Sequence, residues 1–163
     1  MKRLGSHESK RVSRRHTVAV AALGLGISLA LLGSLVRRAD AESAPDFRVI
    51  VHPDNPSNAL ERDFLVDVFL KRVTRWSDGE SIHPVDQKAS SYVRKRFSET
   101  VLQRSVAAVK SYWQQRIFSG RELPPPELES DEAVVAYVLK HRGAVGYVSG
   151  AAKLEHVKAV QIQ

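Results

Sequence analysis

The feature that most constrains this chain is an uncharged apolar segment, residues 17–36, close to its N-terminus. Six basic residues precede this segment, and a small-x-small pattern follows it at residues 39–41. A basic region, an apolar region and a small-residue site in this order are typical of a bacterial export leader. The sequence therefore predicts a leader over residues 1–41 and a separate domain of 122 residues over 42–163.

Two fates of this leader remain open. Cleavage after Ala41 would release a mature chain that begins at Glu42. Twenty apolar residues are also long enough to span a bilayer as an uncleaved anchor, and Arg37-Arg38 follow them directly. Arg14-Arg15 is a weak match to a twin-arginine signal, so the export route stays open as well. Either way the domain faces outward, and we expect a periplasmic or secreted protein, or one held at the inner membrane by residues 17–36.

The net charge of +7 belongs mostly to the leader. Residues 1–41 contain eight of the 25 basic residues and only two of the 18 acidic ones, which leaves 17 basic against 16 acidic residues in 42–163. A protein that binds phosphodiester backbones needs a clustered basic surface. We therefore expect no nucleic-acid partner for this nearly neutral domain.

The residue types that catalysis and cofactor binding require are missing or scattered. The chain has no cysteine, which excludes disulfides, thiolate metal sites and thiol nucleophiles. It also has no Gly-x-Ser-x-Gly elbow, no His-Glu-x-x-His motif and no phosphate loop, and its histidines lack ligand spacing. We expect a protein that is not an enzyme and that carries no cofactor and no metal.

Strand and helix patterns alternate along 42–163. Runs rich in β-branched residues predict strands over 47–52, 82–85, 144–148 and 157–162. Apolar residues at helical spacing predict four helices, which begin at Asn58, at Ser90 or Ser91, at Ser105 and at Ser130. The third helix is expected to bury Val109, Tyr112, Trp113 and Ile117. This alternation predicts a single small α/β domain with about four strands and about four helices.

Several segments, taken together, resemble a known family. VTRWSDGESIHPVDQ (73–87), the helix start at Ser90-Ser91, SYWQQRIFSGRELPPPE (111–127) and GAVGYVSG (143–150) occur in a familiar order and spacing. They are similar to segments of the phosphate-binding proteins of bacterial ABC transporters, within the type 2 periplasmic binding protein superfamily, and above all to their short relatives of single-lobe length. The resemblance spans about residues 47–162 and implies a periplasmic-binding-protein-like fold with a role in transport.

The resemblance also implies where a ligand would bind. In the family, a helix start supplies hydroxyls and amides to phosphate, and Ser90 keeps its place in the matching segment 84–92. Asp86, however, stands where the family has an arginine. A helix N-terminus offers unpaired amides and a positive dipole end to an anion. The candidate ligand-binding residues at the two capped helix starts are Lys88, Ser90, Ser91 and Arg94 at one and Ser57 and Asn58 at the other.

Two functions follow from these expectations. The first is a solute-binding-like domain for phosphate or a similar oxyanion, working with an ABC transporter. The second is an interaction module in the cell envelope that keeps the fold and has lost the ligand. A lone lobe cannot enclose a small ion, because good sites bury most of their ligand. A second copy of the chain, or a transporter component, would then have to supply the other wall.

Overall fold

The computed structural model describes residues 46–163, which belong to one compact unit. The expected leader, its cleavage between Ala41 and Glu42 and the expected membrane anchor lie outside the described residues, so they stay predictions. Among residues 46–163, none of the helices combines the length and the apolar character needed to cross a bilayer.

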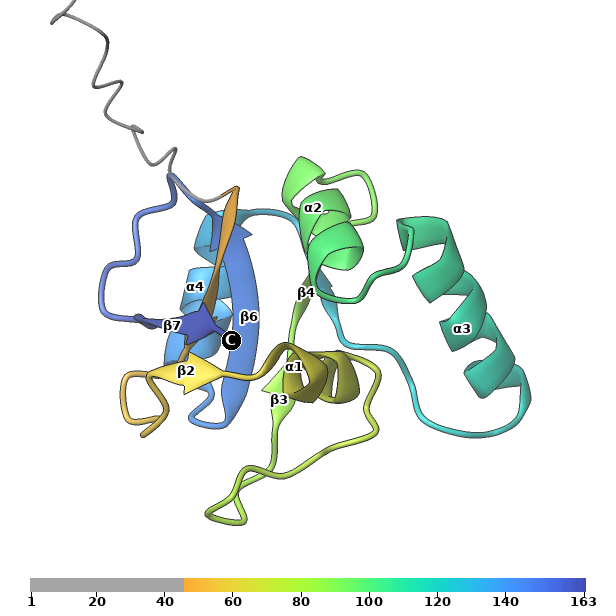
Figure 1. Cartoon of the computed structure of the whole chain (residues 1–163), viewed down its shortest axis with the longest axis horizontal. Coiled ribbons are helices and arrows are strands. Elements are labelled where there is room, and N and C mark those ends of the chain that lie inside the picture. The colour runs from red at the N-terminus through yellow and green to blue at the C-terminus, as the bar shows by residue number, and fades with distance from the viewer. Residues whose placement is uncertain (1–45) are drawn as a thin grey trace, which may run out of the picture. The chain divides into compact units, whose positions relative to one another are not determined.

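A mixed five-stranded sheet forms the centre of the domain (Figure 1). Its order is β2-β7-β1-β6-β3. The strands are β1 (Phe47–Val51), β2 (Ala59–Leu60), β3 (His83–Pro84), β6 (Ala144–Ser149) and β7 (Lys158–Ile162). β1 runs antiparallel to both β6 and β7, whereas β2 is parallel to β7 and β3 is parallel to β6. All four strands expected from the sequence are confirmed, and no bound differs by more than one residue.

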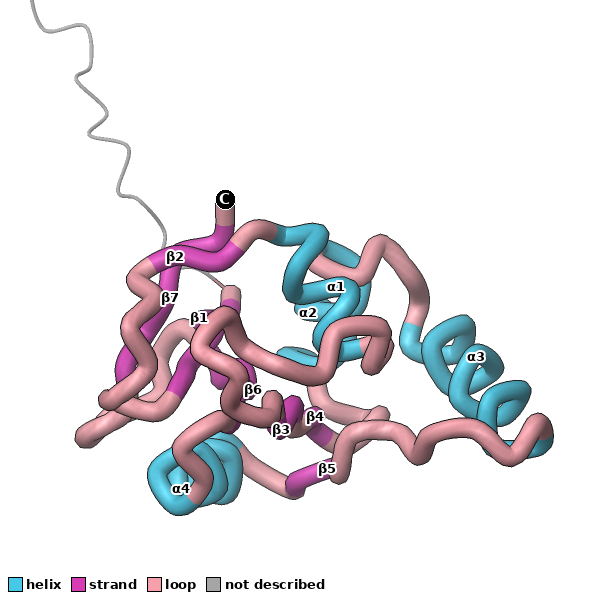
Figure 2. Tube along the Cα trace, turned by 90° about the horizontal axis from the view of Figure 1, so that it is seen from below, coloured by secondary structure: helices cyan, strands magenta, loops and turns pink. Residues whose placement is uncertain are grey.

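Four helices accompany the sheet: α1 (Arg62–Phe69), α2 (Tyr92–Thr100), α3 (Val106–Phe118) and α4 (Asp131–Lys140). α4 covers one face of the sheet, and α1 and α2 lie on the other (Figure 2). Serine side chains accept a first-turn amide at α2, α3 and α4, as a helix N-cap does. These three helix starts are confirmed, and the α/β layering is confirmed with them.

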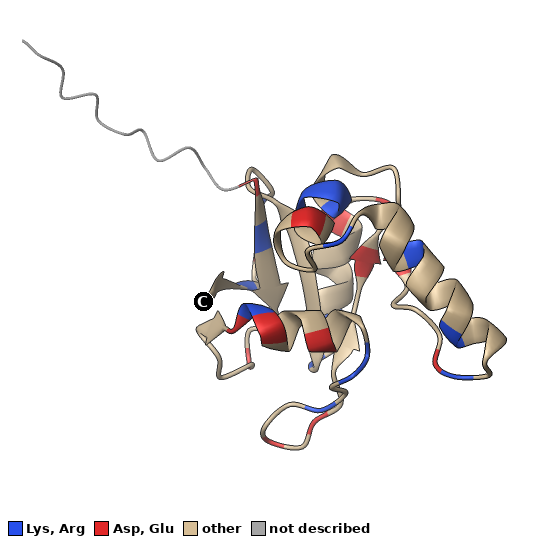
Figure 3. Ribbon diagram, turned by 45° about the vertical axis from the view of Figure 1, so that its right-hand side comes forward, with Lys and Arg blue, Asp and Glu red and all other residues tan. Residues whose placement is uncertain are grey.

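Charges are spread over the described domain rather than gathered in one region. Figure 3 shows that the positions of basic and acidic residues alternate along the helices and loops. Most ion pairs join exposed or half-exposed groups, such as Arg72 with Asp67 at 2.6 Å and Arg96 with Asp46 at 2.7 Å. Exposed pairs of this kind contribute little to stability.

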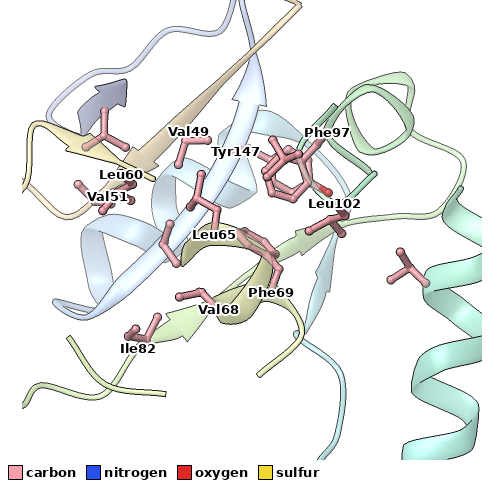
Figure 4. Close-up of a cluster of buried hydrophobic side chains, with 14 of the residues drawn as sticks. Val49, Val51, Leu60, Leu65, Val68, Phe69, Ile82, Phe97, Leu102 and Tyr147 are labelled. Atoms are coloured by element: carbon pink, nitrogen blue, oxygen red, sulfur yellow. The ribbon is translucent and has the colours of Figure 1, made fainter. Parts of the chain in front are cut away.

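The core has two halves because side chains on a strand alternate between the faces of the sheet. Val49, Val145 and Tyr147 face α1 and α2, where they meet the buried aromatic rings of Phe69 and Phe97 (Figure 4). On the other face the buried side chains come from the alternate positions and from α4: Ile50, Ala144, Val148, Val134, Val135 and Val138. Residues 46–163 supply the buried side chains of both halves.

Two sequence expectations are wrong. Asn58 does not cap a helix: α1 begins at Arg62 after Glu61, which makes no side-chain cap bond. Ala59–Leu60 instead pair with β7, and the Asn58 carbonyl accepts the Gln161 amide at 3.0 Å. The expected buried stripe of α3 is also too wide, because Ile117 is 45% exposed.

Candidate functional site

The start of α2, residues 88–93, is the helix N-terminus that the sequence singled out. The serine that caps it is Ser91, whose hydroxyl oxygen accepts the Arg94 amide at 3.4 Å. The same hydroxyl donates to the Gln87 side-chain oxygen at 2.7 Å. Ser90 is exposed and makes no cap bond. Of the two serines that the sequence left as alternatives, Ser91 therefore holds the helix start and Ser90 faces solvent.

This helix start is open rather than packed under other side chains. Lys88, Ser90 and Tyr92 are all exposed. Within the described residues, the amides of Tyr92 and Val93 have no hydrogen-bond acceptor. The Lys88 ammonium pairs with the Glu129 carboxylate at 3.0 Å, which offsets its charge. The α2 start therefore offers an anion two backbone amides and one ammonium group, that of Lys88, whose charge is partly compensated.

Gln87 joins the starts of α2 and α4. Its side-chain oxygen accepts from Ser91, and its side-chain nitrogen donates to the Asp131 carboxylate at 2.8 Å. The same Asp131 oxygen accepts the Ser149 amide at 3.1 Å. A carboxylate of the protein itself therefore occupies the space beside the first turn of α4, where the helix dipole favours negative charge.

Beneath the α2 start lies a buried ion pair between Asp86 and Arg94. The two residues are only 4% and 3% exposed. Asp86 sits in β4 (Asp86–Gln87), which pairs in parallel with β5 (Glu127–Leu128), and Arg94 is in the first turn of α2. The Tyr147 hydroxyl donates to Asp86, and the Gln87 amide donates to the same carboxylate at 3.0 Å. The carboxylate is thus held by a cation and two neutral donors.

The orientation of Tyr147 is set by its packing. Its ring stacks on Phe97 with centroids 3.9 Å apart and planes 7° from parallel, and Phe69 packs tilted against both rings, 4.6 Å from Phe97 and 5.8 Å from Tyr147 (Figure 4). This packing directs the Tyr147 hydroxyl toward Asp86 and Arg94. The Arg94 Nη1 donates to the hydroxyl oxygen at 3.4 Å. Burial raises the pKa of Tyr147 to about 12. The phenol is therefore a neutral donor at any physiological pH.

Burial also lowers the pKa of the Arg94 guanidinium from its usual value, against the pull of the negative charge on Glu127. An arginine nevertheless keeps its charge inside proteins. Its counter-charge is Asp86, so the guanidinium has no uncompensated charge to offer a ligand. The Arg94 Nε–H is buried and has no acceptor within the described residues.

A pocket of about 280 Å³ adjoins this ion pair. Asp86, Ala89 and Arg94 line one side of it. Trp113 and Ile117 of α3, with Pro124 and Pro125 of the following loop, make an apolar wall on the other side. We call this the α3 pocket. Lys110 and Glu127 also line it, so both signs of charge are present at its surface.

The structure brings together four of the six candidate residues and separates the other two. Lys88, Ser90 and Ser91 lie at the α2 start, and Arg94 is buried directly beneath it. Ser57 and Asn58 lie beside β2, at the edge of the sheet opposite β3. The Ser57 amide donates to the Asn55 side chain at 2.9 Å, which makes a local turn. Because α1 begins at Arg62, Ser57 and Asn58 are not at a helix N-terminus, and ligand binding at these two residues stays a prediction without that support.

Sequence reasoning missed Gln87 and Tyr147, which contribute as much to this region as the candidates do. Tyr147 left a signal in the sequence, because a phenol in a strand that is otherwise apolar needs a buried partner. Gln87 left none. Within residues 46–163, no group of three or more histidine or acidic side chains is arranged to hold a metal ion.

Comparison with solved structures shows which fold the domain has. Its α/β fold is similar to part of the fold of phosphate-transport receptors. No protein-family model matches the sequence, and no curated protein matches it either. The likeness therefore rests on solved structures.

Three of these structures illustrate the likeness, and each matches 72% of this chain. An ABC-type phosphate transport receptor from Vibrio cholerae has a TM-score of 0.55 at 23% identity, over 46% of its own length. A putative phosphate ABC transporter substrate-binding protein with bound phosphate, from Clostridium perfringens, has a TM-score of 0.53 at 21% identity, over 44% of its length. PstS from Borrelia burgdorferi has a TM-score of 0.55 at 10% identity, over 47% of its length. The chain thus spans less than half the length of these proteins, and the likeness shows the fold alone.

Proposed function

We propose that this chain is an exported, non-catalytic interaction module that keeps one lobe of the phosphate-binding fold and holds no free phosphate. The observation that carries the proposal is the buried Asp86–Arg94 pair. Arg94, which lies beneath the α2 start, is neutralised by the Asp86 carboxylate of the same chain, and the Tyr147 hydroxyl also donates to this carboxylate. In this proposal, the Asp86 carboxylate takes the position beside Arg94 that an anionic ligand would need.

Magnitudes support this proposal. Micromolar binding requires about 8 kcal/mol. A helix N-terminus contributes only about 0.3–2 kcal/mol toward a charge, and the α2 start adds little beyond its free amides. An arriving oxyanion would also be repelled by Asp86, which lines the adjoining pocket. The summed binding free energy is well below the value that specific phosphate binding needs.

The second candidate function is capture of phosphate or a similar oxyanion, in connection with an ABC transporter. The openness of the α2 start favours it, because Ser90 is exposed and the amides of Tyr92 and Val93 have no hydrogen-bond acceptor within residues 46–163. The likeness in fold to phosphate receptors also supports it.

Calorimetric titration of inorganic phosphate into residues 42–163 separates the two. The interaction module is expected to give no saturable heat and no shift in melting temperature at millimolar phosphate. Ser90→Ala is the matched variant, because it removes an exposed hydroxyl that caps nothing. Saturable binding by the wild type that Ser90→Ala weakens would refute the interaction module and support oxyanion capture.

A further inference from the structure

α3 is the least covered helix of the domain. It projects to one side of the sheet and its flanking helices in both views (Figures 1 and 2). Of its thirteen residues only Val109 and Trp113 are buried. At its C-terminal end Phe118 is 90% exposed, and Leu123 in the following loop is 67% exposed. Large apolar side chains that stand together in solvent mark interaction surfaces.

A protruding ring and an apolar hollow lie next to each other on this surface. Phe118 directly follows Ile117, which lines the α3 pocket. With 90% of its surface exposed, Phe118 does not fill the pocket of its own chain. The pocket is large enough for a ring, since its volume is about 280 Å³ and a cavity of about 150 Å³ takes up benzene. The surface therefore presents an exposed aromatic ring next to an apolar pocket that could accept such a ring.

The charges at the pocket are complementary to each other. Lys110 and Glu127 both line it, and neither has an ion-pair partner within the described residues. In a twofold dimer, any contact from one residue to another is repeated with the roles exchanged. A contact from Lys110 of one copy to Glu127 of the other would therefore occur twice in the dimer, and the two contacts would pair all four charges.

We propose that a second copy of this chain docks on α3 about a twofold axis, with the Phe118 ring of each copy in the α3 pocket of the other. Thirteen helical residues span about 20 Å. Two antiparallel α3 helices would place Phe118 of one copy opposite Val106 of the other, and Val106 lines the pocket. The inference rests on the proposed interaction function and names the partner.

Sedimentation equilibrium on residues 42–163 tests the dimer, since this unit contains both halves of the core. The expected result is a mass that rises from monomer to dimer with concentration. Phe118→Ser is expected to weaken the dimer at least about tenfold, as the loss of a central aromatic anchor does. Ile162→Ser, which removes a partly exposed apolar side chain from the far strand β7, is the control and is expected to leave the mass unchanged.

A charge exchange makes the test independent of folding defects. Lys110→Glu and Glu127→Lys are each expected to weaken the dimer about threefold to tenfold at low salt, and the double variant is expected to restore it. Lys95→Glu, which changes an exposed lysine on α2, is the matched control and leaves the dimer intact.

A monomer at every concentration would overturn the proposal, and so would a dimer that Phe118→Ser leaves unchanged. The first result would assign the apolar end of α3 to another occupant, such as residues 17–36 or a different protein. Neither outcome changes the expected result of the phosphate titration. The dimer and the proposed interaction function can therefore be refuted separately.

Discussion

Replacing Asp86 by alanine would leave the Arg94 guanidinium buried without its counter-charge. Breaking a buried ion pair from one side costs about 3–5 kcal/mol, because the remaining charge stays desolvated. A domain of this size has a total stability of about 5–15 kcal/mol, so Asp86→Ala removes a large fraction of it. The variant also opens a space that faces the α3 pocket, next to a cation and a phenol donor.

That space is shaped for an anion, so the stability of Asp86→Ala should depend on phosphate. If the variant binds phosphate with a dissociation constant of about 1 mM, then about 100 mM phosphate would return roughly 2.7 kcal/mol. The wild type, with its carboxylate in place, should gain nothing specific. Urea unfolding, followed by tryptophan fluorescence, measures the unfolding free energy of the wild type and of Asp86→Ala. Each protein is measured in phosphate and in chloride at equal ionic strength.

The double variant Asp86→Ala with Arg94→Met is the control. It has no buried charge to compensate, so its stability should be the same in phosphate and in chloride. The reasoning is refuted if Asp86→Ala shows no phosphate dependence, or if the wild type is stabilised by phosphate as strongly as the variant. The second result would also contradict the proposed function.

Three further predictions concern residues around the site. Ser91→Ala should cost about 0.5–2 kcal/mol of unfolding free energy through the lost cap, whereas Ser90→Ala should change it by less than about 0.5 kcal/mol; urea unfolding of both variants checks this. Gly146→Ala should cost about 1–3 kcal/mol, because an added Cβ would lie 2.7 Å from a methyl group of Val134; an equal melting temperature for variant and wild type would contradict this. Burial raises the pKa of Tyr147 to about 12, from about 10 in an unfolded chain, so its contribution to stability is complete below pH 10 and is lost as pH rises toward 12. Ultraviolet titration of wild type against Tyr147→Phe should therefore reveal one phenol that ionises late, and a difference centred near pH 10 would refute the assignment.

Local patterns in the sequence were enough for most elements of the fold. Ser105 and Ser130 each precede an apolar stripe at helical spacing, and both cap the helices expected there. The β-branched run 47–52 became the central strand of the sheet. Such signals are local because a cap or a strand preference acts within one turn or within a few residues.

Local patterns failed where a distant partner decided the outcome. Asn58 and Glu61 have the spacing of a capping box, yet pairing with β7, a hundred residues further on, draws Ala59–Leu60 into the sheet. Ile117 has the spacing of a buried position, yet 45% of its surface is exposed, because α3 projects away from the sheet (Figure 1). Propensity is a weak preference that tertiary contacts readily override.

The sequence by itself determined that this chain contains a small α/β domain without cysteine chemistry, with a serine-capped helix start at residues 88–93. It could show that Asp86 replaces an expected arginine, but not where its carboxylate points. Only the tertiary structure decided that, by bringing β4, α2 and β6 together so that Asp86, Arg94 and Tyr147 meet. The physical reason is that a buried charge must find its counter-charge through space, and spacing along a chain does not encode that distance.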